Sequence, residues 1–251
     1  MQRITLLLAA LFPFIASAQL SGEYIYGFTN PAVWDFTGTY ITTELGIVRT
    51  STLNHAPSGA VTGSGNLHYE EAGVFFDANQ TSNGKVTANA KFGVRLSVKG
   101  SGEFTLDFGD GPLMGPFKGS LNATLDPGAR TLNGPISGKL CIPGAGCETI
   151  GTNTTLTLPA NMNGSWTLTL NVQTTGSSVT GTATVTLSNN RELSYDVTGS
   201  YSSSTGLSKL KLKGTGGAVR SSLSVTVNGA GNVQTLKGKL FGQPVAFPSL
   251  L

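Results

Sequence analysis

The chain of 251 residues contains 34 glycines, only 12% charged residues and a formal net charge of +3. This composition favours helices poorly, and no segment beyond the N-terminus shows a helical repeat of apolar residues. The small charge excess, without aromatic residues interleaved among the basic ones, argues against a nucleic-acid-binding protein. The length is sufficient for one large domain or two small ones.

Residues 1–18 have the pattern of a secretory signal peptide. Arg3 precedes an apolar run over residues 4–15, and residues 16–18 (ASA) are the small residues after which a signal peptidase cleaves. No cysteine follows the run, so we expect no lipid anchor. The mature chain is expected to begin near Gln19 and to be exported, either secreted or periplasmic.

Residues 164–247 alternate between apolar and polar side chains with a period of two. Consecutive side chains of a strand point to opposite faces, so this alternation predicts strands with one buried face. Glycine and asparagine separate the runs, and both residues tolerate the positive φ that tight hairpins require. The segment is therefore predicted to be an antiparallel up-and-down meander of about six strands.

The first part of the chain repeats features of the last part in the same order. Residues 38–40 correspond to 164–166, residues 61–64 to 179–182, residues 99–102 to 213–216, and residues 138–140 to 238–240. These matches predict an internal duplication, with a first copy over residues 19–160 and a second over residues 161–251. The first copy has the longer loops, where functional residues tend to lie.

The second copy opens with Gly164-Ser165-Trp166, followed by residues 179–182 (VTGT) and 197–201 (VTGSY). A G-x-W at the start of a meander resembles the calycin barrels, the group that contains the lipocalins and avidins. The resemblance implies a closed sheet with the first-strand tryptophan plugging one end, and closure removes exposed edges. It does not imply biotin binding, because Trp166 is the one tryptophan of this copy. We therefore expect an all-β, closed or nearly closed barrel built from two related copies.

Cys141 and Cys147 bracket a Pro-Gly and a Gly that are typical of a hairpin tip. In an exported chain, an even and local pair is expected to form a disulfide across that hairpin. A metal or redox site would need further ligands or a CxxC spacing, and neither is present. The sequence predicts no metal and no cofactor.

Aromatic residues are concentrated near the start of the mature chain, around the turn at Asn30-Pro31. Rings with polar edges provide contact area and orientation, so this segment is the candidate ligand site, with Trp34 as the strongest single candidate. The alternative is a strand that seals the end of the barrel. The residues are Tyr24, Tyr26, Phe28, Trp34, Phe36 and Tyr40.

A second candidate site is a basic ridge in the second copy. Its lysines alternate with leucines, which predicts that they share one face of two strands. Such a ridge is suited to phosphates or an acidic polymer, although alternating lysines also form ordinary solvated sheet faces that prevent aggregation. The ridge residues are Lys209, Lys211, Lys213, Lys237 and Lys239.

No catalytic motif is found in the sequence. The two histidines, His55 and His68, belong to no recognisable spacing, and G-x-S-x-G is absent. Glu70, Glu71 and Asp77 offer carboxylates for glycoside hydrolysis, but Glu70 and Glu71 are neighbours on a predicted strand and point to opposite faces. We expect no enzymatic activity, with a carbohydrate-active hydrolase as an alternative.

The alternation also fits a transmembrane barrel with lipid-facing Leu and Val. Aromatic residues do not recur at strand ends, however, and the chain ends in PSLL rather than in an aromatic residue. The main prediction is thus a secreted or periplasmic binding barrel for a small apolar molecule or a glycan. An outer-membrane or cell-surface structural barrel stays open, membrane association is not excluded, and the oligomeric state is not predicted.

Overall fold

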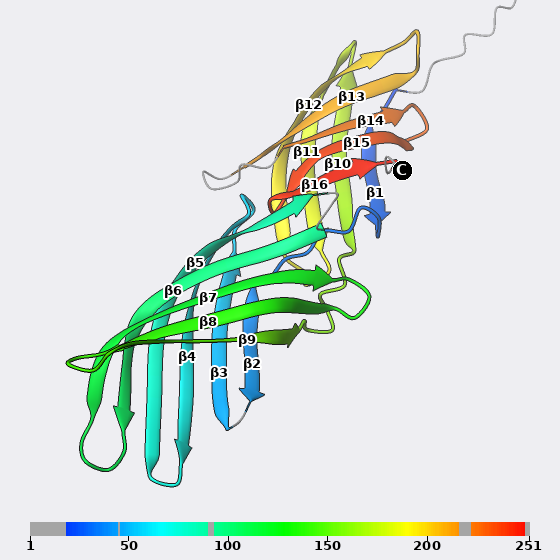
Figure 1. Ribbon diagram of the computed structural model, residues 1–251. Helices are drawn as coiled ribbons and strands as arrows, with labels where there is room; N and C mark the ends of the chain where they lie inside the picture. The colour runs from blue at the N-terminus through cyan, green and yellow to red at the C-terminus, as the bar shows by residue number, and fades with distance from the viewer. Residues whose placement is uncertain (1–18, 45, 90–92, 216–221, 249–251) are drawn as a thin grey trace, which may run out of the picture.

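A computed structural model describes residues 19–44, 46–89, 93–215 and 222–248. The predicted signal peptide at residues 1–18 lies outside these residues. The regular structure of the described chain is β-strand throughout, and no helix in it is long and apolar enough to cross a membrane. The strands form two antiparallel sheets of eight, each curled into a half-barrel, so the predicted all-β meander architecture is confirmed (Figure 1).

Sheet I contains the longer strands. It consists of β2 (Gly38–Glu44), β3 (Ile47–His55), β4 (Ala60–Glu71), β5 (Val74–Asn89), β6 (Gly93–Asp107), β7 (Leu113–Asp126), β8 (Thr131–Ile142) and β9 (Gly146–Thr157). Sheet II consists of β1 (Gly22–Phe28), β10 (Trp166–Thr175), β11 (Ser178–Leu187), β12 (Glu192–Ser202), β13 (Leu207–Gly214), β14 (Ser222–Asn228), β15 (Val233–Leu240) and β16 (Gln243–Phe247).

Sheet II follows the period-two pattern closely. On β10 the side chains of Trp166, Leu168, Leu170 and Val172 are buried, while the threonines between them face outward. The inner face is one apolar cluster, and the outer face carries mainly Thr, Ser and Lys. The meander of residues 164–247 contains seven strands, β10 to β16, where about six were expected.

Strand β1 changes the division of the chain that the sequence predicts. It precedes sheet I in the chain but pairs along its whole length with β10, with Phe28 opposite Trp166 and Gly22 opposite Val172. Its inward-facing aromatic rings extend the apolar inner face of β10 and pack on the core of sheet II. The boundary near residue 160 still separates β9 from β10, but sheet II includes residues 22–28.

The position of β1 also affects the predicted repeat. Counted across each sheet, residues 61–64 and 179–182 both lie in the third strand, and residues 138–140 and 238–240 both lie in the seventh. Tyr40, however, lies in the first strand of sheet I, and Trp166 lies in the second strand of sheet II. The two rings therefore occupy different strand positions in the two sheets, although both are buried as expected. The duplication itself stays a prediction.

Sheet I has two apolar clusters that are separated by a band of glycines on its inner face. An added Cβ at Gly100 would lie 2.4 Å from Gln80 Oε1, and one at Gly119 would lie 2.9 Å from the same atom. The Gln80 side chain therefore occupies space that the glycines leave free. The cluster beyond this band, at the far end of the sheet, contains Leu67, Ala78, Phe104 and Phe117.

The two sheets meet end to end and interlock at their turns. The β3–β4 turn packs so closely on the β15–β16 turn that a Cβ at Gly242 would lie 2.9 Å from Gly59 Cα. The side chain of Gln243 binds both backbone groups of Trp34, since Nε2 donates to the carbonyl at 2.7 Å and Oε1 accepts from the amide at 3.1 Å. These contacts leave little room for one sheet to move relative to the other.

Candidate functional site

The aromatic segment lies mostly in the interior. Phe28, Trp34, Phe36 and Tyr40 are all at most 6% exposed, and Tyr24 and Tyr26 are the less buried members. The segment crosses from sheet II to sheet I, and its rings are divided between the two cores. This placement is that of a seal between the half-barrels, which is the alternative that the sequence left open.

Specific contacts fix these rings. Phe28 stacks on Trp166 at 4.4 Å between ring centroids and meets Phe247 edge-on at 5.8 Å, which brings the two edge strands of sheet II together. The Tyr40 hydroxyl donates a 2.9 Å hydrogen bond to the Phe36 carbonyl. Trp34, the predicted site residue, is 4% exposed in the core of sheet I, and its backbone is held by Gln243 of sheet II.

A buried polar cluster lies at the same junction. Asp35 Oδ1 accepts hydrogen bonds from the amide of Thr37 at 3.0 Å and from its hydroxyl at 2.8 Å. Asp35 Oδ2 accepts from Asn189 Nδ2 and from Arg191 Nη1, both at 3.1 Å, so a residue before sheet I is tied to the β11–β12 turn of sheet II. Arg191 also donates to the carbonyl of His55 at 2.6 Å.

Asp35 and Arg191 form an ion pair in which both carboxylate oxygens also accept hydrogen bonds from neutral groups. Burial raises the pKa of Asp35, but the hydrogen bonds that the carboxylate accepts outweigh burial and hold the pKa well below its usual range. His55 Nδ1 accepts the amide hydrogen of Phe36 at 3.2 Å and lies 3.6 Å from Asp35 Oδ1. The cluster therefore joins the sheets, and His55 is a core residue.

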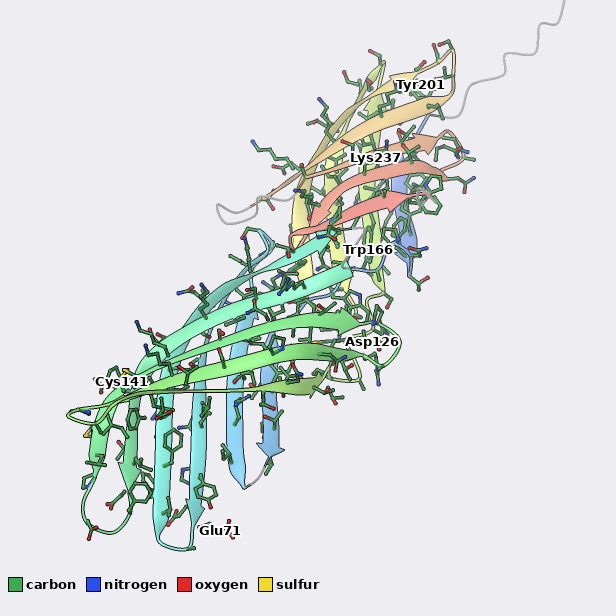
Figure 2. The ribbon with its side chains drawn as sticks, in the orientation of Figure 1. Glu71, Asp126, Cys141, Trp166, Tyr201 and Lys237 are labelled. Carbon is green, nitrogen blue, oxygen red and sulfur yellow. A yellow bond between two sulfur atoms is a disulfide. The ribbon has the colours of Figure 1, made fainter. Side chains whose placement is uncertain are left out.

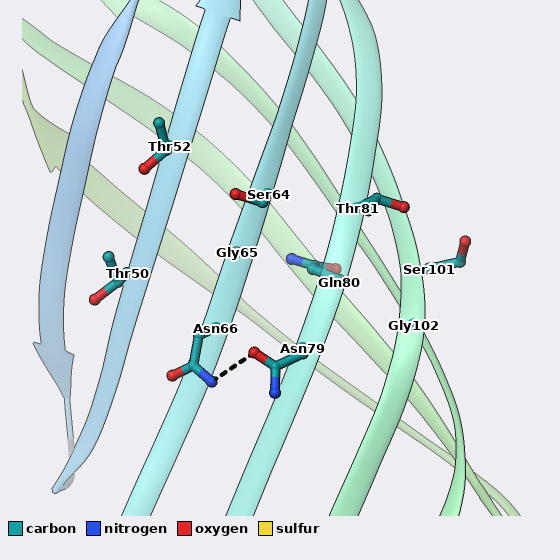
Figure 3. A pocket seen from close by; sticks show the side chains of 10 residues that line it. All are labelled: Thr50, Thr52, Ser64, Gly65, Asn66, Asn79, Gln80, Thr81, Ser101 and Gly102. Atoms are coloured by element: carbon teal, nitrogen blue, oxygen red, sulfur yellow. Dashed lines mark hydrogen bonds between the residues drawn. The ribbon is translucent and has the colours of Figure 1, made fainter.

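A surface groove lies on the outer face of sheet I, over strands β3 to β6. We call it the amide groove; it has a volume of about 450 Å³ and is open to solvent. Its lining is uncharged and rich in hydroxyl and amide groups (Figure 3). The lining residues are Thr50, Thr52, Ser64, Gly65, Asn66, Asn79, Gln80, Thr81, Ser101 and Gly102.

Strand register places these side chains in rows across the sheet. Thr50 pairs with Asn66, which pairs with Asn79, so the three outward-facing side chains lie side by side on β3, β4 and β5. The next row joins Thr52, Ser64, Thr81 and Ser101. The alternation that puts these residues outside turns Gln80 inward, so Gln80 contributes backbone to the groove.

A hydrogen-bonded network orients the amides at one end of the groove. Asn66 Nδ2 donates to Asp77 Oδ1 at 2.9 Å and to Asn79 Oδ1 at 3.0 Å, and Asn79 Nδ2 donates to Asp77 Oδ2 at 2.7 Å. Both amide hydrogens of Asn66 are thereby used, which leaves its carbonyl oxygen as an acceptor for a ligand. The groove thus combines fixed amides with rotatable hydroxyls.

Apolar side chains border the same rows. Ile41 is 68% exposed and lies opposite Thr50, while Val48 is 37% exposed and lies opposite His68. Phe75 is on the same face of β5 and contacts the His68 ring edge-on at 5.7 Å. A ligand in the amide groove would therefore meet polar groups in the middle and apolar groups at the margins.

The candidate carboxylates lie next to the groove. His68 Nδ1 is 3.5 Å from Asp77 Oδ1, and His68 Nε2 is 3.9 Å from Glu70 Oε2. Glu71 lies on the opposite face, where its carboxylate accepts a hydrogen bond from Tyr69 at 3.4 Å. Within the described ranges, no cluster of three His, Cys, Asp or Glu side chains is arranged to hold a metal ion.

The basic ridge forms the second groove, on the outer face of sheet II. Lys209, Lys211 and Lys237 line this groove, together with hydroxyl side chains of the neighbouring strands, and its volume is about 630 Å³. Figure 2 shows Lys237 on this sheet, far from Glu71 and Cys141 at the distal end of sheet I. We call this groove on sheet II the lysine groove.

The disulfide prediction is confirmed. Cys141 on β8 and Cys147 on β9 are direct cross-strand partners and are bonded. They close the hairpin at the far end of sheet I and lie outside both grooves.

Comparison of the chain with known protein families, with curated proteins and with solved structures found no match.

Proposed function

We propose that this protein is an exported, non-catalytic glycan-binding protein and that the amide groove is its binding site. The observation that carries the proposal is the row of Thr50, Asn66 and Asn79 with exposed Ile41 at its margin. A sugar presents hydroxyls that both donate and accept hydrogen bonds, together with less polar C–H faces. Amide and hydroxyl side chains can hydrogen-bond the sugar hydroxyls, and aliphatic or aromatic side chains can pack on the C–H faces.

A glycan fits this surface better than a small apolar ligand does. Apolar ligands need a concave and mainly apolar pocket, whereas the amide groove is open and lined with hydroxyl and amide groups. The outward-facing side chains of sheet II are mainly threonine, serine and lysine, which supports a water-exposed protein over one surrounded by lipid. The disulfide and the signal-like N-terminus support export to an oxidising compartment.

The test is a glycan array of neutral oligosaccharides, followed by calorimetric titration of the best binder. The groove variant is Thr50→Val with Asn66→Ala, which removes two adjacent polar groups. The matched control is Thr182→Val with Asn171→Ala, because these residues are also cross-strand partners on an outer face, but in sheet II. We expect the groove variant to lose roughly tenfold or more in affinity, since each lost hydrogen bond is worth about 1 kcal/mol.

The control variant should bind like the wild type. Equal affinity of the groove variant and the wild type would contradict the proposed site, and an array without any neutral binder would contradict the proposed function.

A hydrolase is the second candidate, and one observation favours it. Glu70 and Asp77 both approach His68 at the end of the amide groove, and paired carboxylates are the groups that hydrolyse glycosides. Release of reducing ends from a bound oligosaccharide, abolished by Glu70→Gln or by Asp77→Asn, would establish it. Binding without any release supports the non-catalytic function.

A further inference from the structure

We propose that the lysine groove on sheet II is a second binding site, specific for an acidic polysaccharide. It is independent of the amide groove, since it lies on the other sheet and is suited to anionic rather than neutral ligands. The spacing of its lysines, their exposed charges and the side chains between them favour such a ligand.

The lysines form a regular two-strand array. On β13, Lys209, Lys211 and Lys213 point to the outer face, and neighbours in this series are about 6.8 Å apart along the strand. On β15, Lys237 and Lys239 do the same. Strand β14 lies between them, so the two lysine rows are about 10 Å apart.

Hydroxyl groups fill the space between the two rows. Ser224 is the cross-strand partner of both Lys211 and Lys237, and Ser222 is the partner of both Lys213 and Lys239. These two rows across the sheet read lysine, serine, lysine, and the row that starts at Lys209 continues with Thr226 and Thr235. A row of lysine, serine and lysine places hydrogen-bonding groups for sugar hydroxyls between two cations for the acidic groups of the chain.

The positive charge of this face is only partly offset by the protein. All five ridge lysines are exposed, and in the part of the chain that the structure describes none of them forms a salt bridge. Two carboxylates, Asp196 and Glu192, lie on the same face of β12, and Asp196 is the cross-strand partner of Lys213. Five cations against these two acids leave a positive field over the groove, which attracts polyanions.

The lining favours a polysaccharide over a nucleic acid. Proteins that bind single strands place aromatic rings under the bases, and none of the described residues that line the lysine groove is aromatic. An acidic polysaccharide needs only cations and hydroxyl partners, and the groove supplies both.

The experiment titrates the full chain with heparin and alginate oligosaccharides, which carry sulfates and carboxylates, and with neutral dextran and oligo(dT) for comparison. The groove variant carries Lys209→Gln, Lys211→Gln and Lys237→Gln. The matched control carries Lys99→Gln, Lys118→Gln and Lys139→Gln, an outer-face group on sheet I that includes the cross-strand pair Lys118 and Lys139. Both variants lose the same net charge.

We expect at least one of the two acidic polysaccharides to bind and dextran not to bind this groove. The groove variant should lose roughly tenfold to a hundredfold in affinity, because three solvent-exposed ion pairs are removed. The control should change little, and added salt should weaken wild-type binding steeply. Binding of neither polyanion, equal losses in both variants, or stronger binding of oligo(dT) than of the polysaccharides would overturn the proposal.

Lysine acetylation of the wild type, read by mass spectrometry, provides a measurement that does not depend on a variant. Bound polysaccharide should protect Lys209, Lys211 and Lys237 and leave Lys118 and Lys139 reactive. Protection of the sheet I lysines instead would contradict the site.

Discussion

Replacement of Asp35 by asparagine tests whether the buried cluster holds the two sheets together. The side chain of Asp35 is 2% exposed and accepts four hydrogen bonds, two from Thr37 and one each from Asn189 and Arg191. In Asp35→Asn, an NH₂ group replaces one carboxylate oxygen and faces side chains that themselves donate hydrogen bonds. The negative charge opposite Arg191 is also lost.

The expected loss in the free energy of unfolding is about 3 kcal/mol. Removing one partner of a buried ion pair costs roughly 3–5 kcal/mol, and the lower end applies because Arg191 is 29% exposed and stays partly solvated. The assay is urea unfolding at pH 7, followed by tryptophan fluorescence, since Trp34 and Trp166 both lie near the junction. The control is Asp126→Asn, an exposed residue that accepts two turn amides, and it should change stability by less than about 0.5 kcal/mol.

The lowered pKa of Asp35 also predicts that the stability difference between wild type and Asp35→Asn depends on pH. The pKa of Asp35 is lowered in the folded state from an ordinary value of 3.8, so its stabilising contribution is fully present above that value. It is lost as the pH falls through the folded-state pKa, because the carboxylate then binds a proton in both states. The difference in the free energy of unfolding between wild type and Asp35→Asn should stay constant from about pH 7 to pH 5 and become smaller in stronger acid. Equal stability at pH 7 would refute the role of the cluster.

Three further changes test other parts of the structure. Gly242→Ala should destabilise by about 2 kcal/mol or more, because φ is +74° and the new Cβ would lie 2.9 Å from Gly59 Cα; urea unfolding measures it. Trp34→Ala should cost about 3–5 kcal/mol of stability yet leave glycan affinity of the folded protein unchanged, and a selective loss of binding would restore the aromatic segment as the site. Replacing Cys141 and Cys147 by serine should lower stability by no more than about 2 kcal/mol, since the closed loop is short, and a larger loss in the melting profile would contradict this.

Local pattern predicted the strands of sheet II well. Residues 166–172 alternate strictly, and a period-two repeat with turn residues at its ends has one simple interpretation. The partner of β1 was not predictable in this way, because its alternating residues fit several sheet edges equally well. Pairing with β10 joins segments about 140 residues apart, which only the folded core decides.

The candidate sites were harder to predict for two reasons. The aromatic segment around Trp34 differs clearly in composition from the rest of the chain, but large rings also bury much apolar area and often complete a core. The amide groove gave no such contrast, because Thr50, Asn66 and Asn79 are common residue types that come together only through register across three strands. The junction cluster was missed for the same reason, since Asp35 and Arg191 are separated by 156 residues.

The central claim is that a neutral glycan binds the outer face of sheet I, and amide chemical-shift mapping tests it most directly. The isotope-labelled protein would be titrated with the best neutral oligosaccharide from the array. We predict that the largest shifts fall on residues 50–52, 64–66, 79–81 and 101–102, with sheet II unchanged. Shifts centred instead on residues 24–40, or spread over the lysine groove, would contradict the claim.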